Sequence, residues 1–441
     1  MNRVTLALLL ASALCLPASA LAQGHMLHGV GPVNSAMGGA GTALPLEATG
    51  ALMFNPALIT ETKGNQISFS TEFLRDGLQI DTTLGVLKGR MTPDKQTSVL
   101  PSFGWMMRDP NKRMALGFGL IAMAGFATDY NQDNNSILFS QPPNGFGRIY
   151  TDLRVTKIPV AFGFQATPKL SVGASLNLYL SEFAVAPLPY TFFDVDQAGN
   201  RWYEEAGTLT KRFAASAQVG FLYKASPKMA IGASVTTPQN FKPFEWNSSN
   251  ANPGSPNYGK ASMTRFDLDG PMIVSFGTAL TPNDRTKIAV DGMYTHYVGV
   301  HGFGGPGGVI PATSTVGTTG GSSPGGVVDP FGWRNVWTFK TGVQHQATEK
   351  LVVRAGYNYS QMPLKPETVL SATGAPATFQ HHITGGFGVR IFPFLEAEFS
   401  AYFVPRQHLV GPFLNLQNER IGTLDESNKL TSALIGLNYR F

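Results

Sequence analysis

The sequence predicts an all-β protein, a 14-stranded antiparallel transmembrane β-barrel with a small N-terminal plug in its lumen. Three observations favour this fold class. Apolar and polar residues alternate along many short segments, short and long connections between these segments alternate strictly, and the chain ends on the aromatic residue Phe441. A period of two suits strands that face lipid on one side and a polar lumen on the other. Such strands must close into a barrel, because lipid cannot satisfy the backbone groups of an open sheet edge.

Residues 1–22 have the pattern of a signal peptide. Arg3 gives a positive start, residues 4–16 are mainly apolar, and Ala20-Leu21-Ala22 is an Ala-x-Ala cleavage site. The only cysteine of the sequence, Cys15, lies in this segment and is expected to be removed with it. We therefore expect an exported protein whose stability does not depend on disulfides.

The composition limits the remaining classes. Only 14% of the residues are charged, whereas soluble domains average about 25%, and strands that face lipid account for this deficit. The net charge of +5 is modest and is not clustered, so nucleic-acid binding is not expected. After the signal peptide, no continuous apolar stretch reaches the roughly 18 residues that a membrane-spanning helix needs.

Residues 23–63 do not alternate and are expected to form the plug. Small residues dominate from Gly29 to Ala43, which allows close backbone packing. Residues such as Met37, Leu52 and Phe54 make the segment too apolar for the alternative, a disordered periplasmic tail. A compact segment of this length would close a barrel lumen that otherwise leaks.

The barrel is expected to comprise residues 64–441. Short turns such as Asp109-Pro110-Asn111-Lys112 alternate with long connections such as 182–210 and 299–333, as tight periplasmic turns alternate with extracellular loops. The predicted strands are 65–76, 98–108, 113–126, 151–166, 169–181, 211–224, 229–239, 262–280, 285–298, 334–346, 350–360, 380–391, 395–404 and 430–441. The competing interpretation, a soluble β-sandwich, explains neither the loop asymmetry nor the terminal Phe441.

The segment 29–62 closes on Asn55-Pro56-Ala57 and precedes the fourteen strands. In this respect the chain resembles the FadL/TodX family of outer-membrane transporters for long-chain fatty acids and other hydrophobic compounds. The resemblance implies a plugged barrel in the Gram-negative outer membrane, without an energy source. It also implies ligand capture at extracellular loops, a pocket inside the barrel and sideways exit through a kinked third strand.

We therefore expect passive uptake of hydrophobic small molecules, with long-chain fatty acids as the first expectation. Uptake of monoaromatic or alkane hydrocarbons is the alternative, because Ser181 stands where a cation for a fatty-acid carboxylate would be sought. An outer-membrane lipase or phospholipase is a further alternative. Its only support is Gly321-Ser322-Ser323-Pro324-Gly325, which lies in a Gly/Ser-rich loop without a strand-to-helix elbow, so no enzyme is expected.

Aromatic residues gather in the two loops that correspond to the capture site of the resembled family. They are Phe192, Phe193 and Trp202 in the loop after the fifth strand, and Phe241, Phe244 and Trp246 in the loop after the seventh. Exposed apolar clusters usually mark binding surfaces. The alternative is that these side chains pack into a core of the loops themselves.

A fatty-acid carboxylate in the lumen would need a cation. By strand parity, Lys157, Arg212 and Lys340 point inward and are the candidates, although each could instead pair with an acid of the wall. Tyr179 shares the inward face and is a further candidate for ligand contact.

The resemblance places the lateral exit on the third strand, which contains Gly117, Gly119 and Gly125. Glycine within a strand permits a bulge or kink. The alternative is that glycine is simply frequent in this barrel.

No cofactor or metal is expected. His25 and His28 could bind metal, but we expect them to be an exposed pair near the mature N-terminus, and such pairs usually bind nothing. The calcium-like stretch from Asp194 has Ala198 at a ligand position. We expect a monomer that contacts outer-membrane lipid and lipopolysaccharide. Its aromatic C-terminus resembles the signal that the barrel-assembly machinery recognises.

Overall fold

The structure is a computed structural model. It describes residues 24–62, 64–94, 97–109, 111–136, 138–141, 145–186, 193–195, 197, 201–203, 206–304, 308–310, 327–329, 331–414 and 420–441. The predicted signal peptide lies outside these ranges, so its boundary stays a prediction. Among the described residues, no helix is long and apolar enough to cross a membrane.

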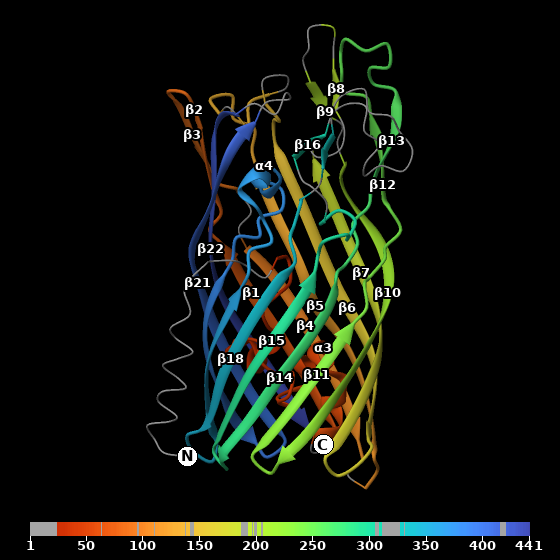
Figure 1. Cartoon of the computed structure of the whole chain (residues 1–441), viewed down its shortest axis with the longest axis vertical. Coiled ribbons are helices and arrows are strands. Elements are labelled where there is room, and N and C mark those ends of the chain that lie inside the picture. The colour runs from red at the N-terminus through yellow and green to blue at the C-terminus, as the bar shows by residue number, and fades with distance from the viewer. Residues whose placement is uncertain are drawn as a thin grey trace.

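Fourteen antiparallel strands form a closed barrel, which confirms the predicted fold class (Figure 1). In order around the barrel they are β1 (Gln66–Asp76), β4 (Thr97–Arg108), β5 (Met114–Tyr130), β6 (Ile149–Gln165), β7 (Leu170–Ala186), β10 (Ala206–Ser226), β11 (Met229–Thr236), β14 (Met272–Asn283), β15 (Thr286–His296), β18 (Val336–Gln346), β19 (Leu351–Ser360), β20 (His381–Phe392), β21 (Leu395–Leu414) and β22 (Arg420–Arg440). The barrel closes where β1 pairs with β22, from Gln66 opposite Arg440 to Asp76 opposite Leu430.

Several predicted strands differ from the observed ones in their bounds, and the largest differences are in those predicted at 262–280, 395–404 and 430–441. The predicted strand 262–280 is divided into β13 (Ala261–Phe266) and β14, because Gly270 pairs with Gln239 and Pro271 lacks the N–H that a continuous strand needs. β13 forms a hairpin with β12 (Phe244–Ser249). The last strand starts ten residues earlier than 430, at Arg420, because β21 and β22 continue beyond the predicted span as a long hairpin.

Further short strands belong to the loops. β2 (Gln79–Leu84) pairs with β22 and with β3 (Leu87–Met91), and thus extends the β21–β22 hairpin. β8 (Phe193–Val195) pairs with β9 (Arg201–Tyr203), and β16 (Gly308–Ile310) pairs with β17 (Val327–Asp329). All of these lie at the end of the barrel opposite the short turns (Figure 1).

The two faces of the wall differ as the alternation predicts. Outward side chains are large, apolar and exposed, among them Phe69, Phe118, Leu176 and Phe213, the last of which is 71% exposed. Inward neighbours such as Ser68 are small or polar and buried. An exposed apolar belt of this kind is stable only against lipid.

The segment predicted as the plug folds into three short helices inside the barrel, near the short turns (Figure 1). They are α2 (Gly31–Ala36), α3 (Ala48–Phe54) and η1 (Pro56–Glu61). Every residue of α2 and α3 is buried. Proline occupies the first turn of α2 and of η1, where its missing N–H costs no hydrogen bond.

Inward-facing glycines of the wall make room for these helices. A Cβ added to any of them would lie within 3.1 Å of an atom of residues 32–60. They are Gly104, Gly117, Gly163, Gly173, Gly220, Gly232, Gly277, Gly342, Gly356, Gly386 and Gly436. Glycine weakens a strand, so its repeated use along the lumen reflects the close approach of the plug.

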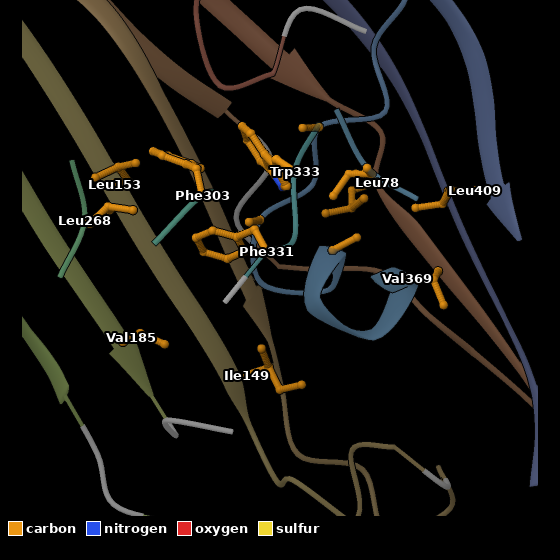
Figure 2. Packing of buried hydrophobic residues seen from close by; sticks show 14 of the residues in the cluster. Leu78, Ile149, Leu153, Val185, Leu268, Phe303, Phe331, Trp333, Val369 and Leu409 are labelled. Carbon is orange, nitrogen blue, oxygen red and sulfur yellow. The ribbon is translucent and has the colours of Figure 1, made fainter. Parts of the chain in front are cut away.

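A large apolar core fills the loop end of the barrel (Figure 2). Phe303, Phe331 and Trp333 pack against one another there in tilted arrangements, with ring centroids 4.6–5.8 Å apart. The connection between β19 and β20 contributes η2 (Pro366–Thr368) and α4 (Val369–Ala372), and Val369 packs into the same core as Leu409 of β21. The lumen is therefore closed from both ends by separate groups of residues.

Candidate functional site

The wall of the barrel has a gap between β4 and β5. These two strands pair only from Arg108 opposite Ala115 to Ser102 opposite Ile121, whereas β5 continues to pair with β6 as far as Tyr130. In the described part of the chain, residues 97–101 of β4 therefore have no ladder partner on β5. Above the gap the chain closes again, because the Asp94 amide donates to the Asp129 carbonyl at 2.9 Å.

The N-terminal segment covers part of the β5 edge that β4 leaves open. The Gly125 amide donates to the His25 carbonyl at 2.9 Å, and the Leu27 amide donates to the Met123 carbonyl at 3.0 Å. Residues 25–27 thus satisfy strand groups that would otherwise be unpaired at a wall facing lipid, where an unsatisfied group costs several kcal/mol.

An irregularity in β5 accompanies the gap. Its register with β6 shifts between Ala122 and Ala124. A Cβ on Gly125 would lie 2.3 Å from the Leu153 carbonyl oxygen, so only glycine fits there. Gly125 is therefore at the predicted kink. Gly117 and Gly119 lie away from this irregularity. Both pair in register with β4 and accommodate Leu52 of α3.

A cavity of about 440 Å³ lies at the gap and is lined from both of its edges. This size falls within the range of about 300–1,000 Å³ that small-molecule sites occupy. Its apolar lining includes Leu74, Val99, Phe126, Leu153 and Phe379. Residues 24–28 form one of its walls, so the N-terminal segment separates the cavity from the plug helices.

The charged lining of this cavity is mainly acidic. Asp76, Asp152 and Glu182 line it, and Arg154 is the lining guanidinium. Arg154 is already engaged, because Nε and Nη2 donate to the two carboxylate oxygens of Asp152 at 2.9 and 2.6 Å. Fixed in this bidentate pair, Arg154 is a poor partner for a ligand carboxylate.

Histidines of the N-terminal segment add no positive charge to the cavity. Burial lowers the pKa of His25 and of His28 to about 3, so both imidazoles are neutral at neutral pH. His25 stacks on Phe303 at 4.4 Å, and its Nδ1 lies 3.1 Å from the Tyr297 hydroxyl. The two residues are buried rather than exposed, and the described residues contain no cluster of three or more metal-ligating side chains.

The predicted lumen cations bind the protein itself. Lys157 and Lys340 do point inward, as parity predicted, and both are nearly fully buried. Lys157 Nζ donates to the carbonyls of Leu52 and Met53 at 3.3 and 3.1 Å, and to Gln218 Oε1 at 2.9 Å.

Lys340 Nζ donates to the His28 carbonyl at 3.2 Å and lies 4.3 Å from the centre of the Phe54 ring. Arg212 lies higher, where it donates to the Pro243 carbonyl at 2.6 Å and pairs with Glu245 at 3.2 Å. These three cations hold the plug and a loop in place instead of facing the cavity at the gap.

A second, much smaller space lies between the plug and the wall. Its volume of about 20 Å³ accommodates about one water molecule. Tyr179 and Lys157 line it, together with the side chains of Met26, Met53 and Met123. Tyr179 donates to, or accepts from, Ser216 Oγ at 3.1 Å.

The predicted aromatic capture residues divide into two groups. Phe244 and Trp246 are buried and pack edge-on against Phe183, so the alternative of a self-packed loop core holds for them. Phe241 is partly buried beside Phe244. Phe192 lies outside the described residues, Phe193 is described only through its backbone in β8, and Trp202 is partly exposed in β9.

The plug motif is a hydrogen-bonded joint. Asn55 is fully buried, and its Nδ2 donates to the carbonyls of Thr42 and Phe221 at 2.8 and 3.0 Å. Its Oδ1 accepts from the Ala57 amide at 3.1 Å and so caps η1. Pro56 starts η1, and the backbone of Pro56 and Ala57 lies directly over Gly173 of β7.

Sequence reasoning missed the residues that border the gap. Residues 25–27 show no pattern that would indicate a strand partner for β5. One signal was present, since residues 121–127 are all apolar or glycine and break the period of two just where β5 loses β4.

Comparisons with known proteins identify the family and support the fold. A sequence profile described as outer membrane protein transport protein (OMPP1/FadL/TodX) matches residues 13–371. The toluene transporter TodX of P. putida is 19% identical with a TM-score of 0.68, over 94% of this chain and 99% of that chain. The Ralstonia pickettii toluene transporter TbuX is 18% identical with a TM-score of 0.66, over 94% and 99%.

A Pseudomonas aeruginosa FadL homologue is 15% identical with a TM-score of 0.69, over 95% of this chain and 100% of that chain. At these identities the solved structures establish the fold alone. No curated protein matches the sequence. Because the profile spans most of the chain, the protein belongs to the OMPP1/FadL/TodX family of outer-membrane transport proteins of Gram-negative bacteria.

Proposed function

We propose that this protein admits neutral hydrophobic small molecules passively and releases them sideways, through the gap between β4 and β5, into the outer membrane. The observation that carries the proposal is the cavity of about 440 Å³ whose lining comes from both edges of that gap. An apolar molecule in this cavity has lipid, rather than water, as its nearest favourable destination.

The closures of the lumen support a lateral route. The loop core fills one end of the barrel and the plug helices fill the other, so a straight aqueous path would have to displace both of them. At the gap, in the part of the chain that the structure describes, the backbone bonds of residues 25–27 bridge part of the opening. A hydrophobic ligand that leaves here avoids the polar plug contacts altogether.

The charges around the cavity favour neutral ligands over fatty acids. Of the acids that line it, Asp152 pairs with Arg154 and Glu182 pairs with Lys211, so a ligand carboxylate placed there would find these cations engaged and would meet the carboxylate of Asp76. Like charges at short range disfavour the ionised form or its binding. Monoaromatic or alkane hydrocarbons avoid this cost. TodX and TbuX are described as toluene transporters, which agrees with this substrate class.

An enzymatic role has less support. The stretch Gly321–Gly325, on which the lipase alternative depends, lies outside the described residues. Members of the family are transport channels. We therefore assign no reaction to the protein.

Uptake by cells tests the substrate class. The full chain is expressed in a Gram-negative host that lacks its own FadL-type transporter, and the initial uptake of radiolabelled toluene and of oleate is measured. We expect the protein to accelerate toluene uptake and to leave oleate uptake near the host background. Equal acceleration of oleate would overturn the preference for neutral ligands.

Cross-linking tests the route. Cysteines at Ser98 and Ala127, which line the cavity from opposite edges of the gap, are joined with a flexible bis-maleimide. The matched control places cysteines at Phe118 and Val160, which pair across the closed seam between β5 and β6. We expect the first cross-link to stop toluene uptake and the second to have no effect. Undiminished uptake by the first pair after complete cross-linking would rule out exit at the gap.

A further inference from the structure

A second concave site lies on the outside of the barrel, where β1 ends and the chain turns at Gly77 toward β2. This cavity of about 450 Å³ is distinct in chemistry from the one at the gap, although Asp76 borders both. Its lining residues are Arg75, Asp76, Gly77, Leu78, Thr92, Arg406, Lys429 and Thr431. Three cations from β1, β21 and β22 thus converge on one hollow, against a single carboxylate.

Strand register brings these cations together. Arg75 lies opposite Thr431 across the β1–β22 seam, and Lys429 is the next residue along β22 on the same outward face. The β21–β22 register shifts between Val404 and Gln407, so two residues of β21, one of them Arg406, oppose a single position of β22. Such a bulge re-aims a side chain, and here it turns Arg406 toward the hollow.

The cations have few partners within the protein. In the described part of the chain, the side chains of Arg75 and Lys429 make no ion pair or hydrogen bond, and both residues are exposed. Arg406 donates through Nη1 to the carbonyl and the hydroxyl of Ser427, at 3.4 and 2.8 Å. A guanidinium has five N–H donors, so most of those of Arg406 stay available.

The neighbouring acids do not neutralise this charge. By strand parity, Asp76 lies on the face of β1 opposite to that of Arg75. Further along β22, Asp425 pairs with His408 at 3.0 Å. The stem of Lys429 crosses Gly77, where an added Cβ would lie 2.6 Å from Lys429 Cγ. Gly77 therefore lets the ammonium group approach the other two cations.

The site lies at the boundary of the lipid-facing belt. Phe73 precedes Arg75 by two residues on the same face, is 45% exposed, and pairs with Val99, which is 57% exposed. Phe403, opposite Thr431, is exposed as well. These apolar side chains lie on the side of the short turns, whereas the β2–β3 hairpin rises on the side of the loops. The cations thus occupy the headgroup level of the outer leaflet.

We propose that this hollow binds the phosphate of a phosphorylated outer-leaflet lipid, whose acyl chains lie along Phe73, Val99 and Phe403. Arginine matches the oxygens of a phosphate in pairs, and lysine adds a point charge. Thr92 and Thr431 supply hydroxyl groups at the same hollow. The inference rests on the outer-membrane location and goes beyond the transport role, since it concerns the exterior of the barrel.

The test measures binding of lipid A to the detergent-solubilised full chain by native mass spectrometry. The variant Arg75→Ala/Lys429→Ala is compared with Lys169→Ala/Lys228→Ala, which removes the same charge at the short turns. Both pairs are exposed. Since each cation near an anionic surface contributes about 1 kcal/mol, we expect the first variant to weaken binding by about tenfold or more. The second should bind as the wild type does.

Further arms separate the outcomes. Dephosphorylated lipid A should bind weakly to the wild type. Lys429→Arg keeps the charge and should retain binding of lipid A, and it is used if the variant with two alanines fails to fold. Equal binding by wild type and Arg75→Ala/Lys429→Ala, with both folded by heat-modifiability on gels, would overturn the site. If inorganic phosphate displaced lipid A at equal concentration, the hollow would be a site for free anions, and the lipid assignment would fall.

Discussion

Replacing Asn55 by alanine tests what holds the plug in the barrel. The change removes two donated bonds, to Thr42 and Phe221, and one accepted bond, from Ala57. The side chain is fully buried, and the wall glycines Gly220 and Gly232 lie against it, so water cannot replace these bonds without a shift of the plug.

The structure allows an order of magnitude for this loss. Each hydrogen bond contributes about 1 kcal/mol, and a buried group left without a partner costs about 1–3 kcal/mol, so the total is roughly 3–6 kcal/mol. The barrel ladders are untouched, and we expect the loss to fall on the docking of α3 and η1. Since about 1.4 kcal/mol corresponds to a factor of ten, the undocked plug should become roughly 10²- to 10⁴-fold more populated.

Two measurements check this expectation. Hydrogen exchange of the amides of α3 and η1 should accelerate by a similar factor, and planar bilayers should show open-channel currents that the wild type lacks. Asn111→Ala, in the exposed turn between β4 and β5, is the matched control and should change neither. If Asn55→Ala left exchange in η1 and conductance at the wild-type level, the idea that this joint holds the plug would be refuted.

Three further substitutions test the wall beside the plug, the gap and a buried carboxyl group of the plug. Gly173→Ala places a Cβ 2.4 Å from the Ala57 nitrogen and should lower the melting temperature and increase channel leak, whereas Gly385→Ala meets nothing nearer than 3.7 Å and should do neither. Gly125→Ala should reduce toluene uptake without lowering expression, because its Cβ would meet the Leu153 carbonyl at 2.3 Å and reshape the gap. Burial raises the pKa of Glu47 from 4.5 to about 8, so the folded plug holds a proton that the undocked segment releases. Plug stability should therefore fall as pH rises from about 4.5 to about 8, and Glu47→Gln should remove this dependence in hydrogen exchange.

Much of the barrel follows from local patterns. Along β7, Leu170, Val172 and Ala174 alternate with Ser171 and Gly173. This period of two identifies the face of β7 that meets lipid. The upper part of β22 was missed for a physical reason. The loop-side half of β22, which precedes Leu430 in the sequence, has left the lipid and pairs with β2. Its outward residues therefore no longer need to be apolar.

The candidate site was less accessible to this reasoning. Parity placed Lys157 and Lys340 correctly inside the barrel, but their partners lie 105 and 312 residues away in sequence. A period in the strand cannot report that backbone carbonyls of the N-terminal segment, rather than a ligand, accept the hydrogen bonds of these ammonium groups. Similarly, aromatic composition cannot distinguish an exposed capture surface from the core in which Phe244 and Trp246 bury each other.

His25 links the two closures that a ligand meets on the lateral route. Its ring stacks on Phe303 in the loop core, and its carbonyl accepts the Gly125 amide at the gap. Freeing residues 25–27 from β5 breaks two backbone bonds, and each strand group left unpaired against lipid costs several kcal/mol. An aromatic ligand that buries roughly 150 Å² of apolar surface gains about 4 kcal/mol. This gain is of the same order as the cost of freeing the segment. Because the loop core holds the same residue, loosening of that core also weakens the cover over the gap.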